Sequence, residues 1–234
     1  LGILALVGLP KAISRYVPRQ HTDEERREVV ASGFQIVLVL STLIALVTFL
    51  FAESIARLAF DNENLVWIFR IFALVLPFYA MFRASIGGFR GYERTKPQVL
   101  TDKILLPGLQ LLGIVAFVIL GYGTAGIAFA YAVAFTLVGV VGVIIVYRIG
   151  KFSMGDLVRR GDFDRHRELL SFSIPLAASG AVGVIAKHSD MIILGIFRTS
   201  SSVGVYEITF RMSMFVVFLF SPAIGYLFQP LISE

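Results

Sequence analysis

The chain has 234 residues, of which 57% are hydrophobic and only 16% are charged, and its mean hydropathy is +0.82. Because a soluble domain is about half apolar and about a quarter charged, this balance indicates a membrane protein. A net charge of +5 would suit a nucleic-acid-binding protein, but the basic residues are confined to a few stretches, and in membrane proteins that pattern encodes orientation. The absence of cysteine excludes disulfides and thiolate metal ligands, and His21, His166 and His188 have no metal-ligand spacing. We therefore expect an integral membrane protein that binds no nucleic acid and needs no metal or other cofactor.

Apolar runs predict an all-α polytopic bundle. A helix that crosses a hydrocarbon core of about 30 Å needs about 20 mostly apolar residues. The first run begins at Leu1 without the basic start or cleavage site of a signal peptide, so we expect a fragment that starts inside a span. Seven runs approach or meet the required length: 1–14 (truncated), 32–52, 65–82, 104–120, 126–147, 169–197 and 203–231.

The basic residues predict the orientation of these spans. Sixteen of the 21 Lys and Arg residues lie in the long stretches 11–31, 83–103 and 148–168, whereas the shorter intervening stretches hold only Arg57 and Arg198. By the positive-inside rule the long stretches are cytoplasmic and the first residue is on the outer side. The expected organisation is an N-terminal lobe over 1–148, a cytoplasmic linker over 149–168, and the first two helices of a second lobe over 169–234.

Several of these stretches carry local signals. Residues 11–31 predict a cytoplasmic helical hairpin in which Thr22 and Glu25 form a capping box. The basic residues of 83–97 are explained by topology, with contacts to anionic lipid headgroups as the alternative. Residues 121–126 match G-x-G-x-x-G, but they lack the βαβ context of a dinucleotide site, so we expect a tight turn. Residues 148–168 predict an amphipathic helix on the cytoplasmic leaflet.

Proline and small residues interrupt the spans. Pro77, Pro107, Pro175 and Pro222 predict kinks, which membrane helices tolerate when neighbouring groups satisfy the freed carbonyls. The pairs Ala177/Ala181 and Ser179/Gly183 have the small-x-x-x-small spacing that permits close helix packing.

A cluster of polar residues lies in the last two predicted spans. It consists of Lys187, His188, Asp190, Glu207 and Arg211. Ionisable groups inside a membrane are costly and usually face the interior of a bundle or a water-filled cavity. One interpretation is mutual neutralisation, with Glu207 paired to Arg211 and Asp190 to Lys187. The other is a substrate cavity in which Arg211 and Lys187 meet an anionic headgroup, while Asp190 or Glu207 carries a coupling proton or cation.

Four sequence motifs resemble those of prokaryotic polysaccharide-biosynthesis flippases. The first is Asp190-x-x-x-Leu194-Gly195-x-Phe197 followed by Ser200-x-x-x-Gly204-x-Tyr206 and Arg211, and the second is the Phe172–Leu176 segment that opens the same helix. The other two are Gly8-Leu9-Pro10 with Ile13–Tyr16, and the Gly88–Arg94 segment.

The resemblance implies a fold like that of the multidrug and toxin extrusion transporters, with two six-helix lobes around a central cavity and alternating access. This chain would supply helices two to eight. The implied function is to flip a lipid-linked oligosaccharide across the cytoplasmic membrane for surface polysaccharide or glycoprotein assembly, without enzymatic activity. The implied partners are the lipid-linked glycan, membrane lipids and glycan assembly enzymes. Asp190 and Arg211 match positions on the cavity side, and Glu207, one turn before Arg211, departs from the family pattern.

Three alternatives remain open. A cation-coupled multidrug exporter of the same fold would have a more aromatic and acidic cavity. A membrane-embedded glycan polymerase or glycosyltransferase would need acidic or His groups on an outer loop, where only Glu53, Asp61 and Glu63 qualify. A non-transporting scaffold would tolerate charge substitutions at Asp190 and Arg211.

Overall fold

The computed structural model describes residues 6, 8–60, 65–152, 163–197 and 201–215, and within these ranges it contains helices and turns but no strand. Four of the described helices are long and apolar enough to cross a membrane: Asp23–Leu50, Val66–Gly91, Thr95–Ile119 and Ala125–Gly150. These helices confirm the predicted all-α membrane bundle. Of the other three predicted spans, 1–14 and 203–231 lie partly outside the described residues. The span predicted over 169–197 lies within the described helix α9 (Phe163–Phe197), which is not among these four.

The first described elements form the predicted helical hairpin. α2 (Leu9–Tyr16) is followed by the short η1 (Val17–Arg19) and then by α3 (Asp23–Leu50). The backbone N–H of Glu25 donates to the Thr22 hydroxyl at 3.2 Å, and Glu25 Oε2 accepts from the Thr22 N–H at 3.2 Å. This reciprocal capping box fixes where α3 begins and confirms the sequence prediction.

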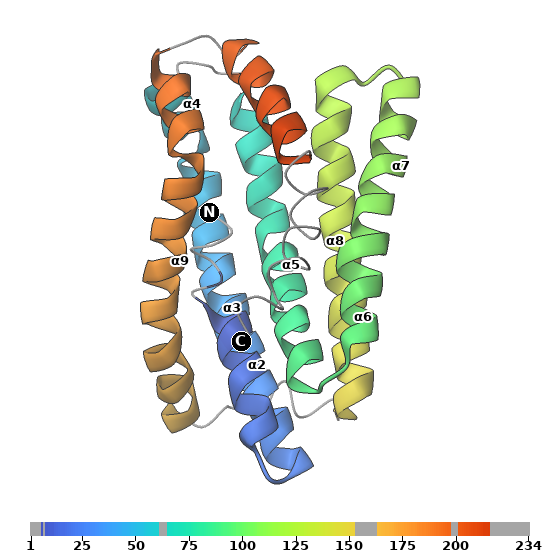
Figure 1. The fold of residues 1–234 in the computed structure, drawn as a ribbon, viewed down its shortest axis with the longest axis vertical. Coiled ribbons are helices and arrows are strands. Elements are labelled where there is room, and N and C mark those ends of the chain that lie inside the picture. The colour runs from blue at the N-terminus through green and yellow to red at the C-terminus, as the bar shows by residue number, and fades with distance from the viewer. Residues whose placement is uncertain (1–5, 7, 61–64, 153–162, 198–200, 216–234) are drawn as a thin grey trace, which may run out of the picture. The chain divides into compact units, whose positions relative to one another are not determined.

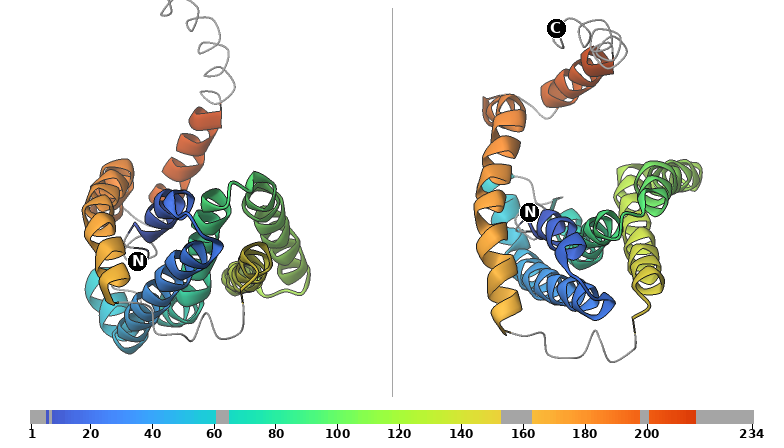
Figure 2. Two further views of the ribbon diagram at one scale, coloured as in Figure 1. Left: turned by 90° about the horizontal axis from the view of Figure 1, so that it is seen from below. Right: turned by 60° about the horizontal axis from the view of Figure 1, so that its bottom comes forward.

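α5 (Val66–Gly91) is the central helix of the bundle. It packs against α2, α3 and α8 (Gly123–Gly150), and α7 (Leu106–Ile119) packs on α8, as Figures 1 and 2 show. Glycines permit the closest approaches. A Cβ at Gly87 would lie 2.5 Å from the carbonyl oxygen of Pro10, and one at Gly139 would lie 2.5 Å from that of Phe78. Small residues therefore bring α5 close to both α2 and α8.

The basic stretch 83–103, which the sequence analysis placed between two spans, is helical over most of its length. α5 continues to Gly91, and the next helix begins at Thr95 as α6 (Thr95–Val99), so only residues 92–94 form the turn. The short stretch after α3 is likewise helical over α4 (Ala52–Phe60). These helices continue past their apolar residues into segments that contain charged residues. The backbone hydrogen bonds of the helix are not interrupted there, because the long charged side chains can reach polar surroundings.

A π-helical turn follows α6. η3 (Leu100–Leu105) lies between α6 and α7, and the backbone N–H at Leu106 donates to the carbonyl of Thr101. Pro107 stands at the start of α7 and has no N–H to offer the carbonyl four residues earlier. The wider π turn accommodates that proline within one continuous helix over Thr95–Ile119. Pro77 and Pro175, in contrast, lie inside α5 and α9 (Phe163–Phe197).

The glycine-rich motif at 121–126 forms a turn between two helices, as predicted. α7 ends at Ile119 and α8 begins at Gly123, and Gly121 and Gly123 have φ of 80° and 54°. Positive φ at both positions favours glycine, because it has no Cβ. The glycines therefore serve a tight connection, and the dinucleotide interpretation is excluded by its helical context.

The chain divides into two compact units, residues 1–181 and 182–234, with the division inside α9. In the first unit, the beginning of α9 packs on α2: Leu169 is buried, and a Cβ at Gly8 would lie 2.7 Å from the carbonyl oxygen of Ser173. The described part of the second unit is the end of α9 and a helix over 201–215. Of the predicted amphipathic linker helix, residues 153–162 lie outside the described residues.

Candidate functional site

The predicted cluster in the second unit contains a hydrogen bond between its two helices. The Tyr206 hydroxyl donates to Oδ2 of Asp190 at 2.5 Å, and Oδ1 of Asp190 accepts from the backbone N–H of Met191 at 3.0 Å. A tyrosine sixteen residues away in sequence thus holds the carboxylate in place. The motif that resembles the flippase family contains Tyr206, but sequence reasoning did not identify it as the partner of Asp190.

Glu207 and Arg211 form the predicted ion pair on the helix over 201–215. Oε1 of Glu207 accepts from Nε of Arg211 at 3.0 Å and from Nη2 at 2.5 Å. The Arg211 side chain remains 76% exposed in this pair. Of the two pairings that mutual neutralisation requires, the one between Glu207 and Arg211 is therefore present. The side chains of Lys187 and His188 lie outside the described residues, so the proposed pairing of Lys187 with Asp190 stays a prediction.

A second charged group lies in the first unit, at the π turn. Oδ1 of Asp102 is 3.7 Å from Nη1 of Arg83 on α5, and Oδ2 is 3.1 Å from Nζ of Lys103. The Asp102 side chain is only 15% exposed, so its charge depends on these two cations. Sequence reasoning missed the group because it placed 83–103 between spans and did not expect Arg83 and Asp102 to lie on neighbouring helices. The signal present in the sequence is Pro107, five residues after Asp102, because a proline within a helix removes the hydrogen bond to the carbonyl four residues earlier and so disturbs the turn before it.

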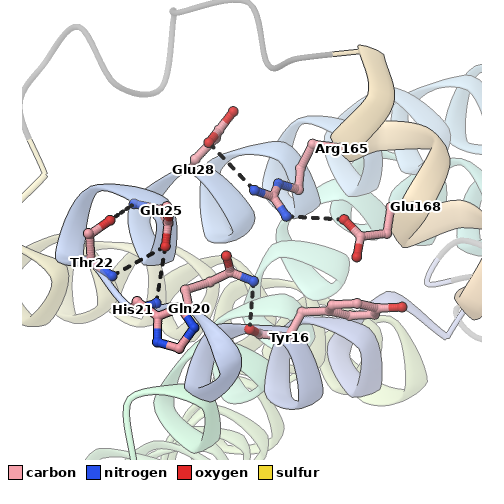
Figure 3. A network of polar contacts seen from close by, with 8 residues as sticks. All are labelled: Tyr16, Gln20, His21, Thr22, Glu25, Glu28, Arg165 and Glu168. Atoms are coloured by element: carbon pink, nitrogen blue, oxygen red, sulfur yellow. Dashed lines mark hydrogen bonds and ion pairs between the residues drawn. The ribbon is translucent and has the colours of Figure 1, made fainter.

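Polar contacts connect the start of α9 to α3. Nη2 of Arg165 is 3.9 Å from Oε2 of Glu28, and Nη1 is 3.1 Å from Oε2 of Glu168 (Figure 3). About two helical turns further along α3, Oε1 of Gln35 is hydrogen-bonded to Nε2 of His166 at 3.2 Å. These residues join the first helix after the predicted linker to a helix of the predicted N-terminal lobe.

Aromatic contacts fix the same part of α9 to α2. The guanidinium carbon of Arg15 lies 4.5 Å from the ring centroid of Phe172, and the rings of Tyr16 and Phe172 meet edge to face at 5.6 Å. Such cation–π and edge-to-face contacts add to the burial of apolar area. The Phe172–Leu176 segment noted in the sequence therefore contributes a packing surface.

The described residues contain no group of three or more His, Asp or Glu side chains that could hold a metal ion. The charged groups described above form ion pairs and hydrogen bonds within or between helices. This arrangement can neutralise charge inside a membrane or present it to a polar ligand. The fold and these groups define the class: a polytopic α-helical membrane protein with charged residues on its spans.

Comparison with known proteins identifies the family. A family model described as "Polysaccharide biosynthesis protein" matches residues 1–234, the whole chain. The chain therefore belongs to the polysaccharide biosynthesis protein family, which confirms the resemblance seen in its sequence motifs.

Two curated relatives are named for their activity. The chain is 26% identical over 232 residues to the "Lipid III flippase" of Escherichia coli (strain K12), and equally so to that of Shigella flexneri. In each case the match covers 94% of this chain and 55% of the relative, so the chain spans about half the length of the curated relatives it matches. No solved structure matches the chain.

Proposed function

We propose that this chain forms part of a transporter, not an enzyme, that flips a lipid-linked oligosaccharide across the cytoplasmic membrane for surface glycan assembly. The family match over the whole chain carries the proposal, and the flippase names of the two relatives support it. A glycan headgroup cannot cross hydrocarbon unaided, because burying its hydroxyls without hydrogen bonds is unfavourable. A protein with charged residues on its spans offers such a headgroup a polar route while the lipid tail remains in the bilayer.

The proposed mechanism is alternating access between two lobes, with the long basic stretches on the cytoplasmic side. In this proposal the linker separates the lobes, and α9 is the first helix of the second lobe. The contacts of Arg165 with Glu28 and of His166 with Gln35 then join the lobes at one end of the bundle. Polar contacts suit an interface that opens and closes, because water can replace them when the two helices separate.

Asp190, Glu207, Arg211 and Lys187 are the proposed cavity residues. Arg211 keeps most of its side chain exposed while paired to Glu207, so its remaining N–H groups are available to a diphosphate or a sugar hydroxyl. Asp190 is oriented by Tyr206, which leaves a carboxylate in a defined position. In this proposal Arg211 binds the headgroup and Glu207 holds the guanidinium in place between transport cycles.

The test is complementation of a strain that lacks its own oligosaccharide flippase, with the full-length protein that carries this chain. The test variants are Arg211→Ala and Asp190→Asn. The chain offers a matched control in Arg57→Ala, because Nη2 of Arg57 pairs with Oε1 of Glu53 at 2.9 Å with the same i, i+4 spacing. We expect rescue by the parent and by the Arg57 variant, and loss of rescue with either test variant at equal expression.

Other outcomes would lead to different conclusions. Rescue by both test variants would make the cluster structural and remove it from the site, and it would be compatible with a scaffold. Failure of a well-expressed parent, together with gained drug resistance, would favour the multidrug exporter instead. Lipid-linked glycan flipping in vesicles would distinguish transport from a role in partner assembly.

A further inference from the structure

An open depression lies at one end of the first unit, where the turn after α5 meets the last turn of α8. Its volume is about 610 Å³, and it is lined by residues 93–97 together with Arg148 and Ile149. Binding pockets for small molecules have volumes of about 300–1,000 Å³. The depression is therefore large enough to accept the polar headgroup of a lipid.

Three cations share this depression. Arg94, Lys96 and Arg148 all line it and are all exposed, and none of them forms an ion pair with any residue that the structure describes. The one carboxylate on the lining is Glu93, which leaves a surplus of positive charge. Two other basic side chains of this unit, Arg83 and Arg165, do form ion pairs with carboxylates. The surplus in the depression thus lacks a counter-charge from the described protein.

The helix dipole favours a positive charge at the position of only one of the three cations. Arg148 lies in the last turn of α8, where the helix dipole favours a positive charge. Arg94 is the N-cap of α6, and Lys96 lies in the first turn of the continuous helix over Thr95–Ile119. A cation at a helix N-terminus is unfavourable for the same reason. A bound anion would compensate both Arg94 and Lys96 at that position.

The walls of the depression are held in fixed positions. Glu93 adopts a left-handed conformation with φ of 56°, and the N–H of the following Arg94 donates to the carbonyl of Phe89 at 2.8 Å. α8 ends in the same way, with Lys151 at φ of 51° and the N–H of Phe152 donating to the carbonyl of Tyr147 at 3.2 Å. These two hydrogen bonds close both helix ends. The basic residues therefore project from a preformed backbone.

A close contact joins the two helix ends. A Cβ at Gly150 would lie 2.7 Å from the Tyr92 hydroxyl oxygen, so glycine permits the α5 end to pack against α8. Burial raises the pKa of Tyr92 to about 12, and the hydroxyl stays neutral at physiological pH. The positive charge at this end of the bundle is thus not offset by a tyrosinate.

The depression lies where lipid headgroups are found. It is formed at the ends of three helices that can cross a membrane: Val66–Gly91, Thr95–Ile119 and Ala125–Gly150. Basic residues at such ends attract anionic lipids of the adjacent leaflet. We propose that this depression binds the phosphate of an anionic phospholipid, with Arg94, Lys96 and Arg148 contacting it. The proposal needs only a membrane-spanning chain and is independent of the substrate that the protein transports.

The test uses the full-length protein in phosphatidylcholine bilayers with spin-labelled phosphatidylglycerol or spin-labelled phosphatidylcholine as the probe. Electron paramagnetic resonance gives the relative association of the two lipids with the protein. The test variant is Arg94→Gln/Lys96→Gln/Arg148→Gln. The matched control is Lys11→Gln/Arg19→Gln/Arg167→Gln, which removes three positive charges from exposed positions outside the depression.

We expect the parent and the control variant to prefer phosphatidylglycerol, and the test variant to lose that preference by at least about tenfold, since each basic residue near a membrane contributes about fivefold in affinity. An equal loss in both triple variants would overturn the proposal, because net charge and not the depression would then attract the lipid. Displacement of labelled phosphatidylglycerol by millimolar inorganic phosphate or pyrophosphate would also overturn it, because the site would then belong to a free anion.

A single exposed substitution guards against misfolding of the triple variant. Lys96→Glu places a carboxylate in the depression and changes no buried contact. We expect it to weaken the phosphatidylglycerol preference more than Lys96→Gln does, with unchanged circular dichroism. A folded Lys96→Glu protein that kept the full preference would contradict the proposal.

Discussion

The Tyr206 hydroxyl donates a hydrogen bond to Oδ2 of Asp190 at 2.5 Å and so joins α9 to the helix over 201–215. A carboxylate on a predicted membrane span is thereby given a neutral donor from the adjacent helix. The bond orients Asp190 without cancelling its charge, which is what a polar ligand or a coupling cation would require. If Tyr206 acts on transport only by orienting Asp190, substitutions of the two residues should not have additive effects on transport.

We therefore predict a non-additive double-mutant cycle. Tyr206→Phe and Asp190→Asn should each lower complementation at equal expression, and the double variant should be no worse than the more damaging single variant. The measurement is flippase complementation scored with membrane abundance. Phe210→Leu, one turn further along the same helix, is a suitable control because the ring of Phe210 contacts that of Tyr206 without a polar bond. Additive losses would contradict a shared role.

The glycines at the α5 contacts give a prediction about stability. Gly87→Ala should lower the free energy of unfolding by about 1–3 kcal/mol, because its Cβ would meet the backbone of Pro10 and overpack the contact. Gly139→Ala should behave similarly against Phe78. Thermal unfolding of the purified protein, followed by circular dichroism, measures both effects.

Gly108→Ala is the matched control, because a Cβ at Gly108 meets nothing within 4 Å among the described residues. Alanine also favours a helix over glycine by about 1 kcal/mol, so this variant should be neutral or slightly more stable. Equal destabilisation by all three substitutions would show that the close approaches at Gly87 and Gly139 do not matter.

The sequence predicts four of the seven spans correctly, because a lipid environment demands long apolar helices. It predicts their ends less well. Arg83 and Lys96 were placed in a stretch between spans, yet both lie in helices, since charged residues do not end a helix that has left the hydrocarbon core. The capping box at Thr22 was predictable because its signal is local and has a fixed spacing.

Contacts between distant residues were harder to predict. The pair Glu207 and Arg211 follows from helical spacing, and the sequence predicted it. The bonds from Tyr206 to Asp190 and from His166 to Gln35 depend on the register between helices, which apolar patterns do not specify. Of the small residues expected at close packing sites in α9, Ala177 lies against Gly8, where a Cβ would be 3.3 Å from the Ala177 backbone nitrogen. A Cβ at Gly183, in contrast, meets nothing within 4 Å among the described residues.

The proposed lobe movement can be tested by cross-linking, because these 234 residues contain no cysteine that would compete with two introduced thiols. Gln35→Cys/His166→Cys places two thiols where α3 and α9 are in hydrogen-bond contact. Joining them with a short, reducible thiol reagent should lower flipping by at least about tenfold if α9 must separate from α3 in each cycle, and reduction should restore it. Flipping of fluorescent lipid-linked glycan in vesicles gives the rate.

The control pair for cross-linking is Tyr79→Cys/Phe135→Cys, which joins α5 to α8 inside the predicted N-terminal lobe. The two rings are 5.0 Å apart, so the reagent can reach both positions. Cross-linking this pair should leave transport unchanged, because the helices of one lobe move together. Full activity of the cross-linked Gln35/His166 variant would exclude separation of these helices during transport.

Asp102 at the π turn gives the last prediction. Asp102→Asn removes the counter-charge of Arg83 and Lys103 from a position that is only 15% exposed. Two cations then lie close together with less compensation, so the free energy of unfolding should fall by about 1–3 kcal/mol. Glu53→Gln, in an exposed pair with Arg57, should change it by less than about 1 kcal/mol. Thermal unfolding in the same detergent compares the two variants. An equally small change in the free energy of unfolding for Asp102→Asn and Glu53→Gln would contradict this prediction. Water would then have to reach Arg83 and Lys103 freely, and the ion pair of Asp102 with Arg83 would not stabilise the contact between α5 and the helix that contains the π turn.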